Sequence, residues 1–350
     1  MKVFIFGAGV SLGAQEKSGT QARTTPPLTQ DLFSPNYKDS AEAVGLPNAH
    51  LDVYREQLRK SKSLEAWLTA KWEHIQQIGS PEHRRWELNE FGKITFYIWR
   101  LIQGVSTAYN TDLTLYRHLL RKIRANEEAY GLITFNYDTL LDRAVQEEFG
   151  CALIDLDVYE QARYVKLHGS INWLMRKRPE DRSINRVDSA GASDSFRILA
   201  SNMYKEAALS AAGLMVIDPS SETMNNLNGL RNVMISTETY YPLLFLPVTT
   251  KQYAYVHGFE EKVMQQARNM LQQAQHIYLI GYQAQDEIIR DVMSGVRPNT
   301  PLQVVSRNAQ SAVQISDRVV EMCQNVLPAR GGHNFNGFED FVRQYEPIGL

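Results

Sequence analysis

Two short stretches, 133–138 and 166–173, constrain the fold of this chain most strongly. Each is part of an apolar segment that ends in polar side chains: Asn136 and Asp138 close the first, and His168 follows the apolar Val165 and Leu167 at the start of the second. Short apolar runs of this kind are typical of buried parallel strands, and open α/β sheets bind ligands where such strands stop. We therefore expect an amide, a carboxylate and an imidazole to converge on one crevice.

Each of these polar residues also has a purely structural interpretation. Asp138 would cap a helix that starts at Thr139, and a histidine before a glycine is often a hydrogen-bonded structural residue. Other strand ends with polar or glycine-rich residues favour the ligand-binding interpretation.

Strands and helices alternate along most of the chain. Besides the two stretches above, apolar strands are expected at 2–6, 242–247, 277–280 and 302–305, and helices at 139–148 and 258–275. This alternation predicts an α/β fold with a doubly wound, Rossmann-like parallel sheet. Five strand ends should then lie on one rim, and they carry Gly7, Gly9, Ser11, Asn136, Asp138, His168, Gly169, Gly281, Tyr282, Ser306 and Asn308.

Two regions interrupt the alternation. A helical pattern from about 51 to 127 predicts an inserted helical module at 34–128 within a single domain that spans 1–350. Its aromatic stripe, which includes Phe91 and Tyr97, is expected to be core. A charged and Ser/Asp-rich segment leads us to expect an irregular insertion at 176–240.

The turn Gly7-Ala8-Gly9-Val10-Ser11 directly follows the first strand. Backbone amides at such a turn can cradle a pyrophosphate. The last glycine of the dinucleotide fingerprint is missing, since Leu12 takes its place. A polar loop at 14–30 follows, which we expect to act as a mobile lid, and the next recognisable sheet strand begins only near residue 131. No strand presents an acidic residue for the ribose, which argues against an ordinary dehydrogenase.

Charge and cysteine content indicate which kinds of partner and which cellular compartment to expect. The formal net charge of −2 gives no basic excess, so direct contact with nucleic acid is not expected. The distant Cys151 and Cys323 form neither a four-cysteine zinc site nor a disulfide framework, which favours a reducing cytoplasm. Cleaving the apolar start as a signal peptide would remove the strand at 2–6, so we do not expect secretion. No apolar run approaches the ~18 residues of a membrane span.

Together these motifs resemble the sirtuin-like family of NAD-consuming proteins. The matching parts are Gly-Ala-Gly-x-Ser at 7–11, Thr-x-Asn-x-Asp at 134–138, Leu-His-Gly at 167–169, Gly281-Tyr282 in place of the family's Gly-x-Ser turn, and Ser-Arg-Asn at 306–308. The resemblance implies that NAD is the substrate. It further implies that Gly7, Ala8, Gly9 and Ser11 hold the diphosphate and ribose, that Asn136 and Asp138 line the nicotinamide-ribose pocket, that His168 is the general base, and that Gly281, Tyr282, Ser306 and Asn308 lie on the adenosine side.

The sequence also departs from the family, and the departures indicate which branch it resembles. Protein-deacylating sirtuins have a four-cysteine zinc ribbon, which this chain cannot provide, so no metal is expected. What remains resembles the bacterial antiphage-defence branch, whose members hydrolyse NAD, often on triggered assembly. That branch implies a homo-oligomer and a partner ATPase or phage-sensing protein. Two alternatives stay open: a non-catalytic subunit that binds NAD or ADP-ribose, and an ADP-ribosyltransferase.

Overall fold

The computed structural model describes residues 1–14, 26–61, 63–108, 114–125, 129–176, 214–226, 234–235, 238–244, 246, 259–285, 287–329 and 335–345. The chain forms two compact units. The first, which we call the sheet unit, consists of Met1–Gln21, Tyr109–His168 and Glu261–Leu350; the second, the helix-rich unit, consists of Ala22–Ala108 and Gly169–Glu260.

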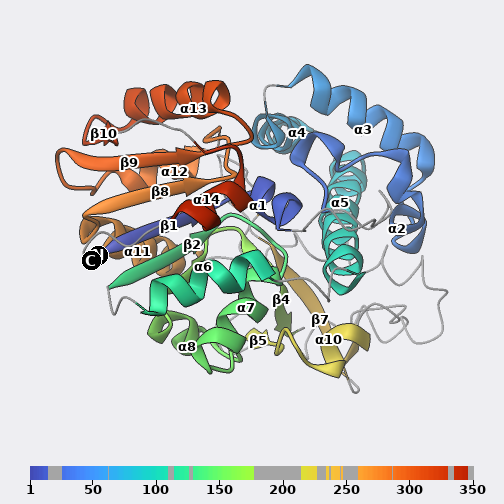
Figure 1. The fold of residues 1–350 in the computed structure, drawn as a ribbon. Coiled ribbons are helices and arrows are strands. Elements are labelled where there is room, and N and C mark those ends of the chain that lie inside the picture. Colours follow the sequence, from blue (N-terminus) through green and yellow to red (C-terminus); the bar gives the residue numbers. More distant parts are fainter. Residues whose placement is uncertain are drawn as a thin grey trace. The chain divides into compact units, whose positions relative to one another are not determined.

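A six-stranded parallel sheet forms the centre of the sheet unit (Figure 1). Its order is β10-β9-β8-β1-β2-β3, with bounds Val326–Pro328, Thr300–Val305, His276–Ile280, Lys2–Phe6, Tyr130–Thr134 and Tyr164–Lys166. Every strand pair in it is parallel. The first strand in the chain is thus a central one, flanked by β2 and β8. The α/β fold with a doubly wound parallel sheet is confirmed.

Helices cover both faces of this sheet. They are α1 (Ala8–Gly13), α6 (Thr114–Ala125), α7 (Leu140–Phe149), α8 (Leu156–Gln161), α11 (Phe259–Gln272), α12 (Glu287–Met293), α13 (Ala309–Met322) and α14 (Phe338–Gln344). On one face, Phe6 packs against Tyr116 of α6, and Tyr278 packs against α14. On the other face, Gly131 lies against Met270 of α11. Burial on both faces explains why the strands are apolar throughout rather than alternating.

The helix-rich unit combines helices with a small antiparallel sheet. Its helical elements are the short 3-10 turns η2 (Thr29–Asp31) and η3 (Pro35–Tyr37), and α2 (Lys38–Ala43), α3 (Asn48–Lys60), α4 (Leu64–Gln77), α5 (Pro81–Ala108) and α10 (Glu222–Asn226). The sheet order is β5-β4-β7-β6, with bounds Leu214–Val216, Gly169–Arg176, Glu238–Leu244 and Met234–Ile235. The described start of the strand expected at 242–247 is therefore the end of β7, which pairs antiparallel with β4 instead of joining the parallel sheet.

Aromatic side chains make up much of the core of this unit. Phe33 contacts the rings of Tyr54, Trp67 and Tyr97, and Phe91 and Tyr97 are fully buried. The Trp99 indole donates a hydrogen bond to the Ile171 carbonyl at 2.9 Å, which links α5 to β4. The prediction that the aromatic stripe is core is confirmed.

The predicted domain bounds stay a prediction. Helix α6 falls within the predicted module at 34–128 but packs in the sheet unit. The predicted lid lies largely outside the described residues, as does most of 176–240. In the part of the chain that the structure describes, no helix is both long and apolar enough to cross a membrane.

Candidate functional site

The predicted site residues lie where five parallel strands end. Strands β3, β2, β1, β8 and β9 are neighbours that run in the same direction, so their carboxyl ends share one edge of the sheet. Beyond these ends stand His168, the Asn136 and Asp138 turn, the Gly7 to Ser11 segment, Gly281 with Tyr282, and Ser306 with Asn308. Carboxyl ends of parallel strands are where open α/β sheets bind ligands. The structure therefore brings the predicted residues to one rim.

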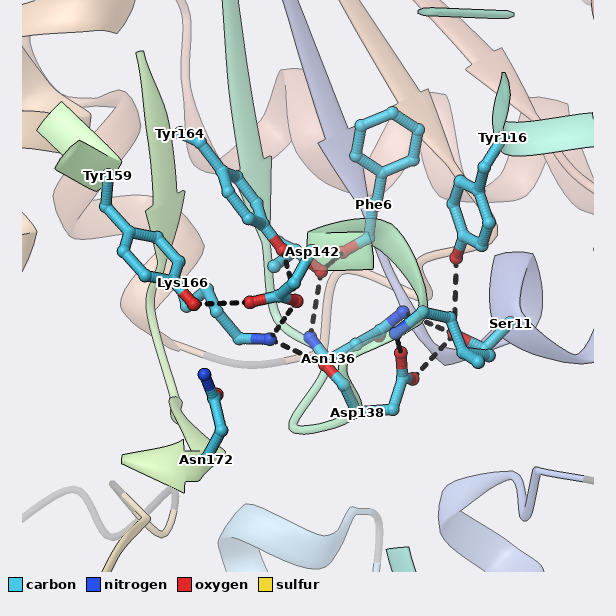
Figure 2. A network of polar contacts seen from close by, with 12 residues as sticks. Phe6, Ser11, Tyr116, Asn136, Asp138, Asp142, Tyr159, Tyr164, Lys166 and Asn172 are labelled. Atoms are coloured by element: carbon cyan, nitrogen blue, oxygen red, sulfur yellow. Dashed lines mark hydrogen bonds and ion pairs between the residues drawn. The ribbon is translucent and has the colours of Figure 1, made fainter. Parts of the chain in front are cut away.

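A hydrogen-bonded trio links the ends of β1 and β2 (Figure 2). The Ser11 hydroxyl donates to Asp138 Oδ2 at 2.7 Å and accepts from Asn136 Nδ2 at 2.9 Å. All three side chains are buried. Tyr116 completes the cluster: its hydroxyl lies 3.3 Å from Ser11 Oγ, and because the single serine proton goes to the carboxylate, the tyrosine is the donor.

The orientation of the Asn136 amide follows from its partners. Nδ2 also donates to the main-chain carbonyl of Gly7 at 3.1 Å. A carbonyl only accepts, so the amide nitrogen must point toward β1, and both of its hydrogens are engaged within the protein. The side-chain oxygen of Asn136 is then the atom with which this residue can accept a hydrogen bond from a ligand.

The Asp138 carboxylate accepts two hydrogen bonds inside the protein. One carboxylate oxygen, Oδ1, accepts from the backbone N–H of Leu140 at 3.0 Å at the start of α7, while Oδ2 accepts from Ser11. Burial raises the pKa of Asp138 above its usual 3.8, and the Lys166 charge and these two hydrogen bonds offset the rise only in part. Asp138 thus holds the first amide of α7 from a buried position, one residue before the N-cap Thr139.

His168 lies within a row of aromatic rings. Phe135 meets the imidazole edge-on at 5.2 Å between ring centroids, and Tyr137 stacks on it at 5.7 Å. Phe135 also stacks on Tyr282 at 4.1 Å. Since Phe135 and Tyr137 are the two chain neighbours of Asn136, these contacts place the imidazole beside the Asn136 turn. His168, Asn136 and Asp138 are all buried, and electrostatic interactions are stronger in buried positions than in water.

The glycines at the ends of β1 and β8 serve backbone packing. A Cβ on Gly7 or Gly9 would lie 2.7 or 2.8 Å from the Gly281 carbonyl oxygen, and one on Gly281 would lie 2.5 Å from the Val10 nitrogen. The Gly7 amide donates to Ile280 O and the Gly9 amide to Gly281 O. These two amides are therefore not free to cradle a phosphate as expected. The segment expected to be a turn is instead the start of α1, with Gly7 as its N-cap and Ala8 as its first residue.

The end of β9 has a structural role that the sequence pattern did not show. Ser306 forms an isolated parallel bridge with Asn336, and the Asn308 side chain accepts from the Ser311 amide at 2.9 Å as the N-cap of α13. Both residues lie on the predicted rim, and an adenosine contact there stays a prediction.

Three residues that sequence reasoning did not assign to the site belong to it: Tyr116, Phe135 and Tyr137. The signal for two of them was present, because aromatic residues alternate with Asn136 and Asp138 just after a strand. Tyr116 had no signal of this kind, since it lies on α6 among core positions. Among the described residues, no group of three or more His, Cys, Asp or Glu side chains is arranged to hold a metal ion.

Comparisons with known proteins give distant structural likenesses. The sequence matches no protein-family model, and no curated protein matches it. The chain is similar to a serine-to-alanine mutant of a Sir2 homologue in complex with ADP-ribose, at 12% identity and a TM-score of 0.40, covering 98% of this chain and 90% of that one. A Sir2 homologue in complex with NAD gives 12% identity and a TM-score of 0.38 over 98% and 88% of the two chains. A structure that addresses the basis of sirtuin substrate affinity is 14% identical, with a TM-score of 0.35, and the match covers 92% of this chain and 93% of that one. Likenesses at this level assign no residue or activity to this chain.

Proposed function

We propose that this protein hydrolyses NAD at the bond between nicotinamide and ribose, releasing nicotinamide and ADP-ribose. The observation that carries the proposal is the interlocked Ser11, Asn136 and Asp138 trio, with His168 beside it, at the edge of the sheet where ligands bind. The motif resemblance to sirtuin-like proteins supports NAD as the substrate.

The roles of the site residues follow from the positive charge that develops on the ribose as the bond breaks. The bond from ribose C1 to the nicotinamide nitrogen breaks with both electrons leaving on nicotinamide, which departs as a neutral molecule. The ribose becomes an oxocarbenium-like cation, which a carboxylate and an amide oxygen stabilise, as in glycoside hydrolysis. Asp138 supplies the carboxylate and Asn136 the amide oxygen. A water oxygen then bonds to C1, and the proton it loses goes to His168.

Burial strengthens the interaction of the Asp138 carboxylate with the ribose cation. A carboxylate surrounded by protein is poorly screened, so it acts on a developing cation more strongly than it would in water. The Ser11 and Leu140 hydrogen bonds fix its two oxygens, so the group needs no rearrangement when the cation forms. Such fixed dipoles and charges are usually the largest single contribution to catalysis.

The test is nicotinamide release by the purified full-length chain. His168→Ala and Asn136→Ala should each stop detectable release, since proton transfer by a positioned side chain contributes typically ~10²–10⁴-fold. The matched control is His118→Ala, because His118 is exposed on α6 and should be dispensable. Turnover by both site variants at the wild-type rate would refute the site assignment.

A second candidate is a subunit that binds NAD or ADP-ribose without turnover. Its support is that both amide hydrogens of Asn136 and both oxygens of Asp138 are already engaged inside the protein. Titration calorimetry with NAD distinguishes the two: tight binding with no nicotinamide release would favour the binding subunit. Mass spectrometry of the products separates hydrolysis from ADP-ribosyl transfer, because transfer leaves a modified acceptor.

The biological role that we propose is a regulated effector of antiphage defence in the cytoplasm. Its support is the motif resemblance to the bacterial defence branch and the lack of four cysteines for a zinc ribbon. A homo-oligomer and a partner ATPase or phage-sensing protein belong to the same proposal. Depletion of cellular NAD during phage infection in cells that express the wild type, and not His168→Ala, would be the expected result.

A further inference from the structure

A buried ion pair lies next to the turn that carries Asn136 and Asp138 (Figure 2). Lys166 Nζ and Asp142 Oδ2 are 2.7 Å apart, and both side chains are 0% exposed. Two tyrosines complete the coordination of the carboxylate: the Tyr159 hydroxyl donates to Oδ1 at 2.5 Å, and the Tyr164 hydroxyl donates to Oδ2 at 3.0 Å. The charge of Asp142 is thus fully satisfied inside the sheet unit.

Lys166 has a second partner, which connects the pair to the site. Nζ donates to the main-chain carbonyl of Asp138 at 2.5 Å. Lys166 is the last residue of β3 and pairs in register with Thr134 of β2, so it reaches the turn from a fixed strand. Asp138 is consequently held at three atoms: its carbonyl by Lys166, Oδ1 by Leu140 and Oδ2 by Ser11.

Stability alone does not account for this arrangement. Burying two charges costs desolvation free energy, and apolar residues of similar volume are often at least as stabilising as a buried ion pair. The feature that apolar residues would not reproduce is the bond to the Asp138 carbonyl. We propose that Lys166, oriented by Asp142, is a positioning residue that fixes the turn 136–138 for cleavage of the nicotinamide-ribose bond. This inference rests on the proposed function.

The charge balance around the turn determines which variants are informative. Arg143 of α7 is also buried and is electrostatically coupled to both Asp138 and Asp142. Removing Lys166 alone would therefore leave two acidic side chains with less compensation, and breaking one side of a buried pair is strongly destabilising. The test should remove both charges of the pair together.

The decisive experiment compares the wild type with the paired variant Lys166→Met and Asp142→Asn. Asparagine keeps an acceptor for Tyr159, and methionine keeps the length of the lysine stem, so we expect the paired variant to fold without the bond to the Asp138 carbonyl. We expect kcat for nicotinamide release to fall ~100-fold while KM for NAD changes less than ~3-fold, because a small misplacement of reacting groups costs about that much. Hydrogen exchange of the segment 135–140 should become faster in the paired variant.

Tyr159→Phe is the matched control. It removes a hydrogen bond to Asp142 but leaves the bond from Lys166 to the Asp138 carbonyl, so kcat per folded molecule should stay within ~3-fold of the wild type. If the paired variant does not fold, Lys166→Arg replaces it, because the planar guanidinium keeps the charge but not the geometry of the ammonium. We expect the same loss of kcat from it.

The outcomes separate the two proposals. Wild-type protein that releases no nicotinamide would refute the proposed function. An active wild type together with a folded Lys166 variant that has unchanged kcat and unchanged exchange at 135–140 would refute the positioning role. A loss of kcat that is as large in Tyr159→Phe would also refute it, since the effect would then come from general destabilisation of the cluster.

Discussion

Replacing Ser11 by alanine tests the trio most directly. The substitution removes the donor to Asp138 Oδ2 and the acceptor for Asn136 Nδ2, both buried. A hydrogen bond to a charged group contributes about 2 kcal/mol, and leaving a buried amide hydrogen unpaired costs about 1–2 kcal/mol more. Ser11→Ala should therefore lower the free energy of unfolding by about 3–4 kcal/mol.

A matched control exists in the same unit. Ser316 of α13 is also 1% exposed, but its hydroxyl has no hydrogen-bond partner among the described residues. Ser316→Ala removes an unpaired polar group from the core and should leave stability unchanged or slightly higher. The two variants share the chemical change and the burial and differ in the partners of the hydroxyl.

Thermal unfolding by circular dichroism measures the difference. At about 2–4 °C per kcal/mol for a domain of this size, Ser11→Ala should lower the Tm by roughly 10 °C, while Ser316→Ala should stay within about 2 °C of the wild type. Nicotinamide release should fall ~10–100-fold in Ser11→Ala, since Asn136 keeps one of its two anchors. Equal Tm shifts in the two variants would show that the trio contributes no more than an ordinary buried serine.

Three further predictions concern pH and backbone packing. Because burial raises the pKa of Asp138, its stabilising contribution is full below the usual 3.8 and is lost as pH rises through the raised value. The stability of Asp138→Asn in urea, measured relative to the wild type, should thus rise from acidic to neutral pH, and the variant should release no nicotinamide; a relative stability that does not change with pH would contradict this. Gly281→Ala places a Cβ 2.5 Å from the Val10 nitrogen at a φ of +60° and should cost more than about 2 kcal/mol, whereas Gly13→Ala should unfold at nearly the wild-type temperature. Burial lowers the pKa of His276 from 6.5 to about 4, so its contribution is present above 6.5 and is lost as pH falls toward 4. His276→Gln should remove that part of the pH dependence, roughly 1–2 kcal/mol after solvent screening, as urea midpoints across this range would show.

The sequence predicted the elements of the parallel sheet well because burial on both faces leaves a simple signal. Apolar runs marked β1, β2, β8 and β9, and the shared direction of parallel strands was enough to place their ends on one rim. The same logic failed for 242–247, because an apolar run looks alike in a parallel strand and in a buried antiparallel one. Pairing partners, not composition, distinguish them.

The side-chain partners in the site were beyond what a linear pattern can show. The bond from the Leu140 amide to Asp138 was predictable, since it involves residues two positions apart, but the bond of Asp138 to Ser11 spans 127 positions. Lys166 was visible only as a polar residue near a strand end. Its bonds to Asp142 and the Asp138 carbonyl depend on how β3 and α7 pack, which no local spacing encodes.

The place of β1 at the centre of the sheet has a consequence for synthesis of the protein. Phe6 on β1 pairs with Thr134 and with Ile280, so β1 needs partners that are made much later. At the usual 5–20 residues per second, roughly 15–55 s separate the emergence of β1 from that of β8. Until β8 arrives, the Gly7 and Gly9 amides have no acceptors and Tyr282 cannot stack on Phe135. A nascent chain on the ribosome therefore lacks the complete candidate site until Tyr282 has been made, so the proposed activity would begin only after that point.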